Sequence, residues 1–391
     1  MVPEQLLPRP CPHSIENDHV HQSHHQMPPS LGDPELAGFG GKLLDDLAPE
    51  MVKISYAITA CITKIREIDG KNVPVAEGSK KIRIKPAFPE QPPINISATD
   101  SQYSTRQEKG IRKGLLSGKL GRLVMESAQP KSFHLPARTG PGDDVMQPVT
   151  TSAVVNLRFD PADESLSPPR LDSLSSKLKA TTYFATVGQR SFPRKEMTLV
   201  DSARGLYSTI MPLASRCVES VQWQKHAGEP KPDSSMQRRD SGVSISGQPA
   251  PSSAYRGGTF YTASVLVPLT LPLDKHIVPT FHSCLASRVY GLSLSLSVQG
   301  GAVGGSSLTL KVPVQVSSAA SAAAEERRAS RAEEHEVLIG FRPRNIAPPP
   351  EAYIGGSASI AGLSAHPPEY ESFNGATPGA ATRHAGLQVC G

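Results

Sequence analysis

Hydrophobic and polar residues alternate along several separate stretches of the chain. The segments Val52 to Ile65 ("VKISYAITACITKI") and Lys80 to Phe88 ("KKIRIKPAF") both alternate in this way, and the first is rich in β-branched side chains. A period of two residues is typical of a strand with one buried face. The link between them, "DGKNVPVAEGS", contains Asp-Gly, which favours a hairpin turn. We therefore predict a β-hairpin here.

Strand patterns recur along the rest of the chain up to Ser318. They occur at Gly121 to Ala128, Ser152 to Asp160, Lys177 to Val187, Gly258 to Pro272, Ala286 to Gly300 and Ser306 to Ser318. The last two strands are joined by the glycine-rich "GGAVGG", which reads as a hairpin turn and not as a phosphate-binding loop, because it does not open a helix. Repeated strands with Gly and Pro breaks, and without alternating helices, predict an all-β fold of antiparallel β-sandwiches.

Two segments depart from this pattern. Residues Lys225 to Gly258 are polar and rich in Ser, Pro and Gly, which predicts a disordered insertion between two strands. After Ser318, "AASAAAEERRASRAEEHEVL" is rich in helix-forming residues and predicts a short charged helix. From Pro343 onward the chain is a tail of small residues and prolines, for which we predict disorder.

Composition narrows the functional classes. Hydrophobic residues make up 38% of the 391 residues, and there are 37 prolines and 32 glycines, which agrees with linkers and a tail. The net charge of +5 gives weak support to contact with an acidic membrane surface or nucleic acid. Aromatic platforms with interleaved basic residues are absent, so nucleic-acid binding is not expected.

The cysteines and the hydropathy profile indicate the cellular compartment in which we expect the protein. The five cysteines lie far apart without a CxxC pair, which predicts no disulfide framework and a reducing, intracellular setting. The start "MVPEQLLPRPCP" lacks the pattern of a signal peptide. No run of about 18 apolar residues occurs, so we expect no transmembrane segment.

Signals for catalysis are missing. The sequence has no G-x-S-x-G motif and no P-loop, so we expect neither an enzyme nor a cofactor. One segment, "HSIENDHVHQSHH", gathers the histidines His13, His19, His21, His24 and His25. Such a cluster can bind Zn²⁺ or Ni²⁺, but no cysteine lies at ligand spacing and no H-x₃-H pair is anchored on a clear helix. We interpret this segment as a solvated loop.

The tail contains a candidate recognition motif, Pro-Pro-x-Tyr, formed by Pro367, Pro368 and Tyr370 within "HPPEY". Two prolines favour the polyproline II conformation, which aromatic-lined WW domains bind. The alternative is an inert stretch of a proline-rich tail. The similar "PPPEAY" (Pro348 to Tyr353) has one residue too many between its prolines and its tyrosine.

Two short motifs match the Arg-Arg-x-Ser pattern that basophilic kinases favour. They are "RRDS", which ends at Ser241 within the predicted insertion, and "RRAS", which ends at Ser330 in the predicted charged helix. A phosphate would add a charge of about −1.5 to −2 and could bind an arginine-lined reader of the 14-3-3 kind. The alternative is that such matches arise by chance in basic linkers.

Several motifs resemble those of fungal arrestin-related proteins, the α-arrestins. The run "IVPTFHSCLASRVYGLSLSLSVQG" followed by "LTLKVPVQV" is similar to their C-terminal sandwich, where P-T-F-x-S-C…S-R-x-Y-x-L precedes a closing strand. Upstream, "HHQMPPSLGD", "KISYAI" and "KIRIKPA" look like the second half of the arrestin N-terminal domain. "VNLRFDP…PPRL" is similar to the early strands of the C-terminal domain. The resemblance covers roughly residues 1 to 317.

This resemblance implies two immunoglobulin-like sandwich domains. Residues 1–117 would form a partial N-terminal domain, and residues 118–318 a C-terminal domain with the insertion at about 225–258. Residues 319–391 would be the charged helix and the tail with the PPEY motif. Arrestin N-terminal domains have several strands before the region where this chain begins. We therefore expect an incomplete first domain with unpaired sheet edges.

The resemblance also implies a function. Such a protein is an adaptor that binds the cytosolic face of membrane transporters or receptors and recruits a HECT-type ubiquitin ligase through its WW domains. It would be cytoplasmic and peripheral at the plasma membrane or endosomes, with Lys42, Lys71 and Lys113 among the candidates for its own ubiquitination. The alternative is a phospho-regulated scaffold that binds 14-3-3-type readers without a cargo role. A third class, a hydrolase or carbohydrate-active sandwich, lacks recognisable paired carboxylates.

Overall fold

The computed structural model describes residues 18–33, 38–39, 42–97, 100–112, 118–137, 147–227, 248–299 and 306–320. Strands dominate these residues, and the two helices among them, α1 (Asp18–His25) and α2 (Lys195–Val200), are short. The predicted all-β fold is therefore confirmed. The first strands are β1 (Gly38–Phe39), β2 (Lys42–Leu43), β3 (Tyr56–Ile65), β4 (Asn72–Ile82), β5 (Arg106–Arg112), β6 (Lys119–Glu126), β7 (Phe133–Leu135) and β8 (Thr150–Pro161). The later ones are β9 (Leu171–Ala185), β10 (Arg204–Cys217), β11 (Gln224–His226), β12 (Phe260–Thr270), β13 (Phe281–His282), β14 (Ala286–Val298), β15 (Ser306–Val314) and β16 (Val316–Ser318).

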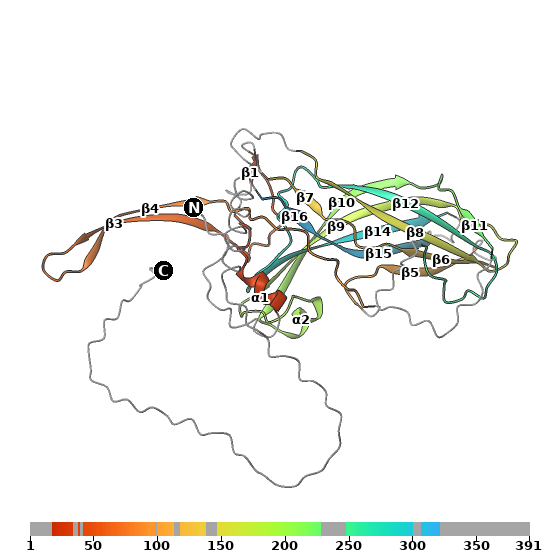
Figure 1. Cartoon of the computed structure of the whole chain (residues 1–391), viewed down its shortest axis with the longest axis horizontal. Coiled ribbons are helices and arrows are strands. Elements are labelled where there is room, and N and C mark those ends of the chain that lie inside the picture. The colour runs from red at the N-terminus through yellow and green to blue at the C-terminus, as the bar shows by residue number, and fades with distance from the viewer. Residues whose placement is uncertain are drawn as a thin grey trace, which may run out of the picture. The chain divides into compact units, whose positions relative to one another are not determined.

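Two five-stranded antiparallel sheets form the main body of the described residues (Figure 1). The first sheet has the order β10-β9-β14-β13, and β15 also pairs with β14. The second has the order β11-β12-β8-β6-β5. The short strands β7 and β16 form a parallel pair. This arrangement is a β-sandwich, because the two sheets share one hydrophobic core.

The core follows from the alternation in the sequence. In β14 the leucines at 292, 294 and 296 are buried, whereas the serines between them lie on the outer face. From the second sheet, Leu157 and Phe159 of β8 join the same core. Since successive side chains of a strand point to opposite faces, each sheet offers one apolar face to the other.

Most strands lie where the sequence predicts them. β6, β8, β9, β12, β14 and β15 overlap the predicted segments. The hairpin also forms, but the predicted link is mostly strand, because β4 begins at Asn72 and the turn occupies only 66–71. The strands β1, β2, β5, β7, β10, β11 and β13 were not predicted. β10 is the longest of these, and its pairing with β9 shifts register between Pro212 and Ala214.

Both ends of the predicted insertion contact the sandwich. At its start, β11 pairs with β12, and at its end, residues 248–258 contact the second sheet. Residues 228–247 lie outside the described part of the chain. The domain boundary proposed between residues 117 and 118 stays a prediction. β5, which lies before that point, pairs with β6, which lies after it.

The hairpin of β3 and β4 is separate from both sheets. The two strands pair with each other, and no third strand pairs with them among the described residues (Figure 1). Its base is fixed by Tyr56, whose hydroxyl donates to the Pro28 carbonyl at 2.7 Å. Lys53 and Lys81 add ion pairs, each 3.3 Å from the buried carboxylate of Asp33.

Candidate functional site

The predicted motif residues lie outside the described part of the chain. This applies to Pro367, Pro368 and Tyr370 of the WW-binding motif, and to Ser241 and Ser330 of the kinase motifs. Their roles stay predictions.

The histidine-rich segment differs from its prediction where the structure describes it. Residues 18–25 form α1 instead of a loop. Val20 is fully buried on this helix and His24 is 8% exposed, so apolar contact and helix formation replace solvation. Within the described ranges no group of three or more His, Cys, Asp or Glu residues is arranged to bind a metal ion.

Several residues of the "PTFHSCLASRVY" motif form hydrogen bonds between their side chains and the backbone. The Thr280 hydroxyl accepts from the amide of Val316 at 3.0 Å, and the Ser283 hydroxyl donates to the Ala286 carbonyl at 2.6 Å. The Tyr290 hydroxyl is buried and donates to the Val278 carbonyl at 2.7 Å. These contacts build the corner that leads into β14.

Arg288 of the same motif is fully buried and connects β14 to the N-terminal part of the chain. Its Nη1 donates to the backbone carbonyl of Asp46 at 3.1 Å. The Asp46 carboxylate in turn accepts from the amides of Gly32 at 2.6 Å and Ala48 at 3.1 Å. Leu47, which lies between Asp46 and Ala48, adopts the left-handed conformation with φ of 61° and places its side chain in the sandwich core. A left-handed non-glycine residue costs about 1–2 kcal/mol, which the burial of Leu47 offsets.

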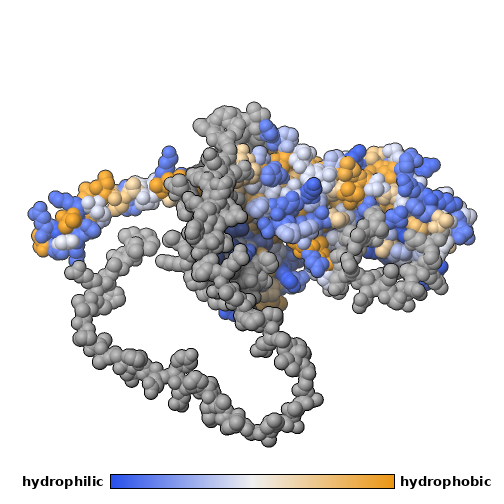
Figure 2. All heavy atoms as spheres, viewed as in Figure 1, coloured by the Kyte–Doolittle hydropathy of each residue, from blue (hydrophilic) through white to orange (hydrophobic). Residues whose placement is uncertain are grey.

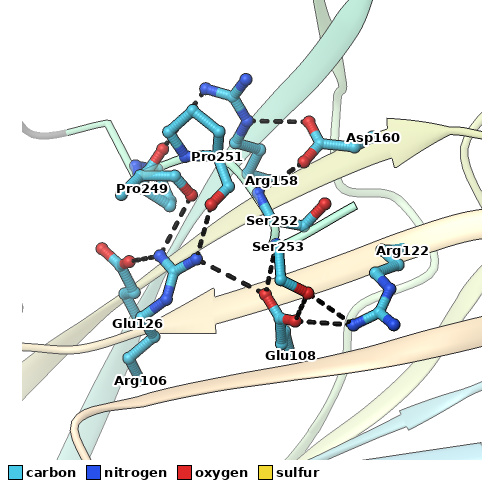
Figure 3. A network of polar contacts seen from close by, with 11 residues as sticks. Arg106, Glu108, Arg122, Glu126, Arg158, Asp160, Pro249, Pro251, Ser252 and Ser253 are labelled. Atoms are coloured by element: carbon cyan, nitrogen blue, oxygen red, sulfur yellow. Dashed lines mark hydrogen bonds and ion pairs between the residues drawn. The ribbon is translucent and has the colours of Figure 1, made fainter. Parts of the chain in front are cut away.

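The most developed polar site lies on the outer face of the second sheet (Figure 3). Residues 249–253, which we call the strap, cross strands β5, β6 and β8 there. Each strand contributes charged side chains to the site: Arg106 and Glu108 from β5, Arg122 and Glu126 from β6, Arg158 and Asp160 from β8. Alternation places these residues on one face because each pair is separated by an even number of positions.

Arg158 and Asp160 form the buried part of this network. Their side chains are only 1% and 4% exposed, and Nε of Arg158 donates to Oδ1 of Asp160 at 2.8 Å. The second carboxylate oxygen accepts from the amide of Ser252 at 2.7 Å, and Nη1 of Arg158 donates to the Pro249 carbonyl at 3.5 Å. The guanidinium also lies 3.8 Å from the ring centroid of Phe260. This geometry places a carboxylate, a carbonyl and an aromatic face against the buried cation.

Arg106 connects the strap to the edge of the sheet. Its guanidinium pairs with Glu126, the residue directly opposite on β6, and donates to two strap carbonyls, Ala250 at 3.0 Å and Pro251 at 2.8 Å. Burial raises the pKa of Glu126, and this effect exceeds the opposing effect of Arg106.

Glu108 binds the last residue of the strap. Its carboxylate accepts from the amide of Ser253 at 2.9 Å and from the Ser253 hydroxyl, and it pairs with Arg122 at 2.6 Å. Burial raises the pKa of Glu108, but the hydrogen bonds from Ser253 and the charges of Arg122 and Arg106 together lower it below its usual value. The ionised form is therefore favoured in the folded protein.

Replacing Glu108 by Gln should reduce stability in a pH-dependent way. A carboxyl whose pKa is lowered on folding contributes stability that is present above its unfolded pKa and is lost as pH falls through the folded pKa. We expect Glu108→Gln to lower the free energy of unfolding by about 1.5–3 kcal/mol at pH 7, the range for hydrogen bonds to a charged group. Urea unfolding at pH 7 and pH 3 tests this: the gap should shrink at pH 3. An equal gap at both pH values would show that the loss comes from packing instead of charge.

The network can position a segment of the chain. Every carboxylate among these six residues pairs with an arginine. Sequence reasoning missed these residues. The available signal was the spacing of "RQE" and "RFD", which places an arginine and an acid two positions apart on one strand face.

Comparison with known proteins gives no family. No protein-family model matches the chain, and a search of curated proteins finds no match. In the part of the chain that the structure describes, no helix has both the length and the apolar character needed to cross a bilayer.

Proposed function

We propose that the protein is an arrestin-like adaptor that recruits a WW-domain ubiquitin ligase of the HECT type to membrane cargo. The observation that carries this proposal is the Pro-Pro-Glu-Tyr motif at 367–370, about fifty residues after the last strand of an antiparallel β-sandwich. The resemblance of several sequence motifs to those of α-arrestins supports the same function.

The mechanism is tethering. Pro367 and Pro368 present a preformed polyproline II turn to the aromatic groove of a WW domain, and Tyr370 fills a second pocket. The folded part of the chain contacts the cytosolic side of a transporter or receptor. Because both partners then bind the same chain, a weak motif suffices, since tethering raises the effective concentration of the ligase near its substrate.

Self-ubiquitination on an exposed lysine fits the same arrangement. Of the candidates named from sequence, Lys71 is exposed in the turn of the β3–β4 hairpin. Lys113 lies outside the described residues, and Lys42 lies in β2.

The test is the replacement of Tyr370 by Ala. A peptide from Ser364 to Phe373 should bind a WW domain with micromolar affinity, about −7 to −8 kcal/mol. Tyr370→Ala empties one pocket and should cost about 2 kcal/mol, which corresponds to roughly thirtyfold weaker binding. In the full-length chain, ubiquitination by the ligase should be lost while the circular dichroism spectrum keeps its β character.

Two controls define the specificity of this test. Glu369→Ala should change binding little, because the spacer side chain points to solvent between the two pockets. Tyr353→Ala in "PPPEAY" should also have little effect, because its spacing places the ring out of register. If the Tyr370→Ala chain is ubiquitinated like the parent, the motif is ordinary tail and the adaptor proposal fails.

A further inference from the structure

The β3–β4 hairpin presents an apolar face that no other described element covers. Ile58 and Ile62 of β3 are 61% and 65% exposed, and both lie on the face that also contains Ala60. Apolar side chains are visible along this ribbon in Figure 2. Isolated two-stranded hairpins are only marginally stable in water, and three or more strands are normally needed. The hairpin therefore has the properties of one half of a larger sheet.

The two edges of the hairpin differ in how they are protected. β4 contains Pro74, Gly78 and the lysines at 80 and 81, and its pairing shifts register at Val75. Proline, bulges and lysine are the usual devices that prevent a strand from pairing with another chain. β4 is thus protected against pairing with another chain, and we call it the closed edge of the hairpin.

Up to Thr63, the edge of β3 has none of these devices. From Ile54 to Thr63 the sequence "ISYAITACIT" contains no charged residue, no proline and no glycine. β3 is also regular, because the extra residue at the register shift belongs to β4. A long, uncharged and regular edge is a template for strand addition.

We propose that β3 pairs with β3 of a second copy of this chain. The two strands run antiparallel about a two-fold axis at Ala60, which gives a four-stranded sheet in the order β4-β3-β3-β4. Ile58 of each copy then lies opposite Ile62 of the other, so the two central strands place four isoleucines on the face that contains Ala60. The smallest side chain of the central part of β3 lies on the axis, and one patch serves both copies, as a two-fold interface requires.

The charges of the hairpin agree with a second copy. In this register no like charges face each other between Ile54 and Thr63, and Lys64 of each copy lies opposite Tyr56 of the other. Lys80 and Lys81 belong to the outer strand β4. That strand is two strand spacings, about 10 Å, from the strand β3 of the other copy, which is about one Debye length.

Light scattering on the full chain tests the proposal. The parent should have twice the 41.7 kDa mass of a single chain. Ala60→Lys places two lysines directly opposite each other on the axis and should halve this mass. Gly78→Lys is the matched control, because Gly78 is paired with Ala60 within the hairpin and a side chain built there meets no atom within 4 Å. It adds the same charge to the closed edge and should leave the dimer intact.

Cysteine cross-linking tests the register. In a Cys61→Ser background, Ala60→Cys should form a disulfide between copies, since directly opposite residues of antiparallel strands are about 4.5–5.5 Å apart. Gly78→Cys in the same background should not form one. Peptide mapping of the cross-linked species identifies the bond.

The outcomes decide the proposal without depending on the adaptor function. A monomeric parent together with no excess cross-linking of Ala60→Cys over Gly78→Cys overturns it, and the open edge then belongs to another polypeptide. A dimer that persists in Ala60→Lys, or that is lost equally in Gly78→Lys, also overturns it. Both positions are exposed on the hairpin, so circular dichroism should show an unchanged sandwich in all variants.

Discussion

Replacing Asp160 by Ala should lower the free energy of unfolding by about 3–5 kcal/mol, the usual cost of breaking a buried ion pair by removing one partner. Arg158 is 1% exposed and would lose its carboxylate while it stays buried. The amide of Ser252 would also lose its acceptor, which lies at 2.7 Å in the parent. Denaturant unfolding at neutral pH measures the change.

The matched control is Asp172→Ala. Asp172 is exposed on β9, and among the described residues its side chain accepts only a long hydrogen bond of 3.4 Å, from Ser173. A surface substitution of this kind should change stability by less than about 0.5 kcal/mol. If Asp160→Ala were as mild as Asp172→Ala, the Arg158–Asp160 pair would not contribute to stability in the way its burial implies.

A double variant separates the loss of a pair from the loss of packing. Replacing a buried ion pair by apolar residues of similar volume is often neutral, because two desolvation costs disappear together. Arg158→Met combined with Asp160→Leu should therefore be more stable than Asp160→Ala alone. If the double variant is no better, the damage comes from the strap, which also loses the contact between Arg158 and the Pro249 carbonyl.

The strands that the sequence predicts are those with a clean period of two. β14 is the clearest example, since its leucines and serines alternate and the structure buries the leucines. β10 lacks this signal. Its sequence "RGLYSTIMPLASRC" mixes apolar and polar residues because it is an edge strand whose register shifts at Pro212, so neither of its faces is uniformly buried. Burial against neighbours, which one sequence does not reveal, decides such a strand.

The charged network could not be derived from local pattern for a related reason. "RFD" in β8 suggests an ion pair on one face of a strand, and β8 was predicted. However, Arg106 and Glu126 come together only because β5 pairs with β6. The sequence of β5, "RQEKGIR", reads as a charged loop and does not predict this pairing. The strap comes from a segment whose composition predicts disorder. Its order depends on arginines about 90 to 145 positions away, and no local pattern reports such contacts.

His282 should make the protein lose stability as the pH falls from 6.5 to about 4. Burial, with a smaller effect from the charge of His24, lowers the pKa of His282 from 6.5 to about 4. Its Nδ1 is buried and has no hydrogen-bond partner among the described residues, and its ring lies 4.7 Å from that of Phe192. The folded protein therefore keeps this imidazole neutral.

The direction in which stability changes with pH follows from proton binding. Between pH 6.5 and about 4 the unfolded chain binds a proton at His282 and the folded chain does not. Stability is thus fully present above pH 6.5 and falls as pH decreases, by up to about 1.4 kcal/mol per pH unit and about 3 kcal/mol in total. His282→Phe removes the titrating group and an unpaired buried nitrogen, so unfolding free energies measured from pH 7 to pH 4 should decline less steeply than in the parent. His24→Gln removes only the smaller cause and should retain most of the slope. An NMR titration that placed the midpoint of His282 near 6.5 would contradict this account, because burial of the neutral ring would then have no energetic consequence.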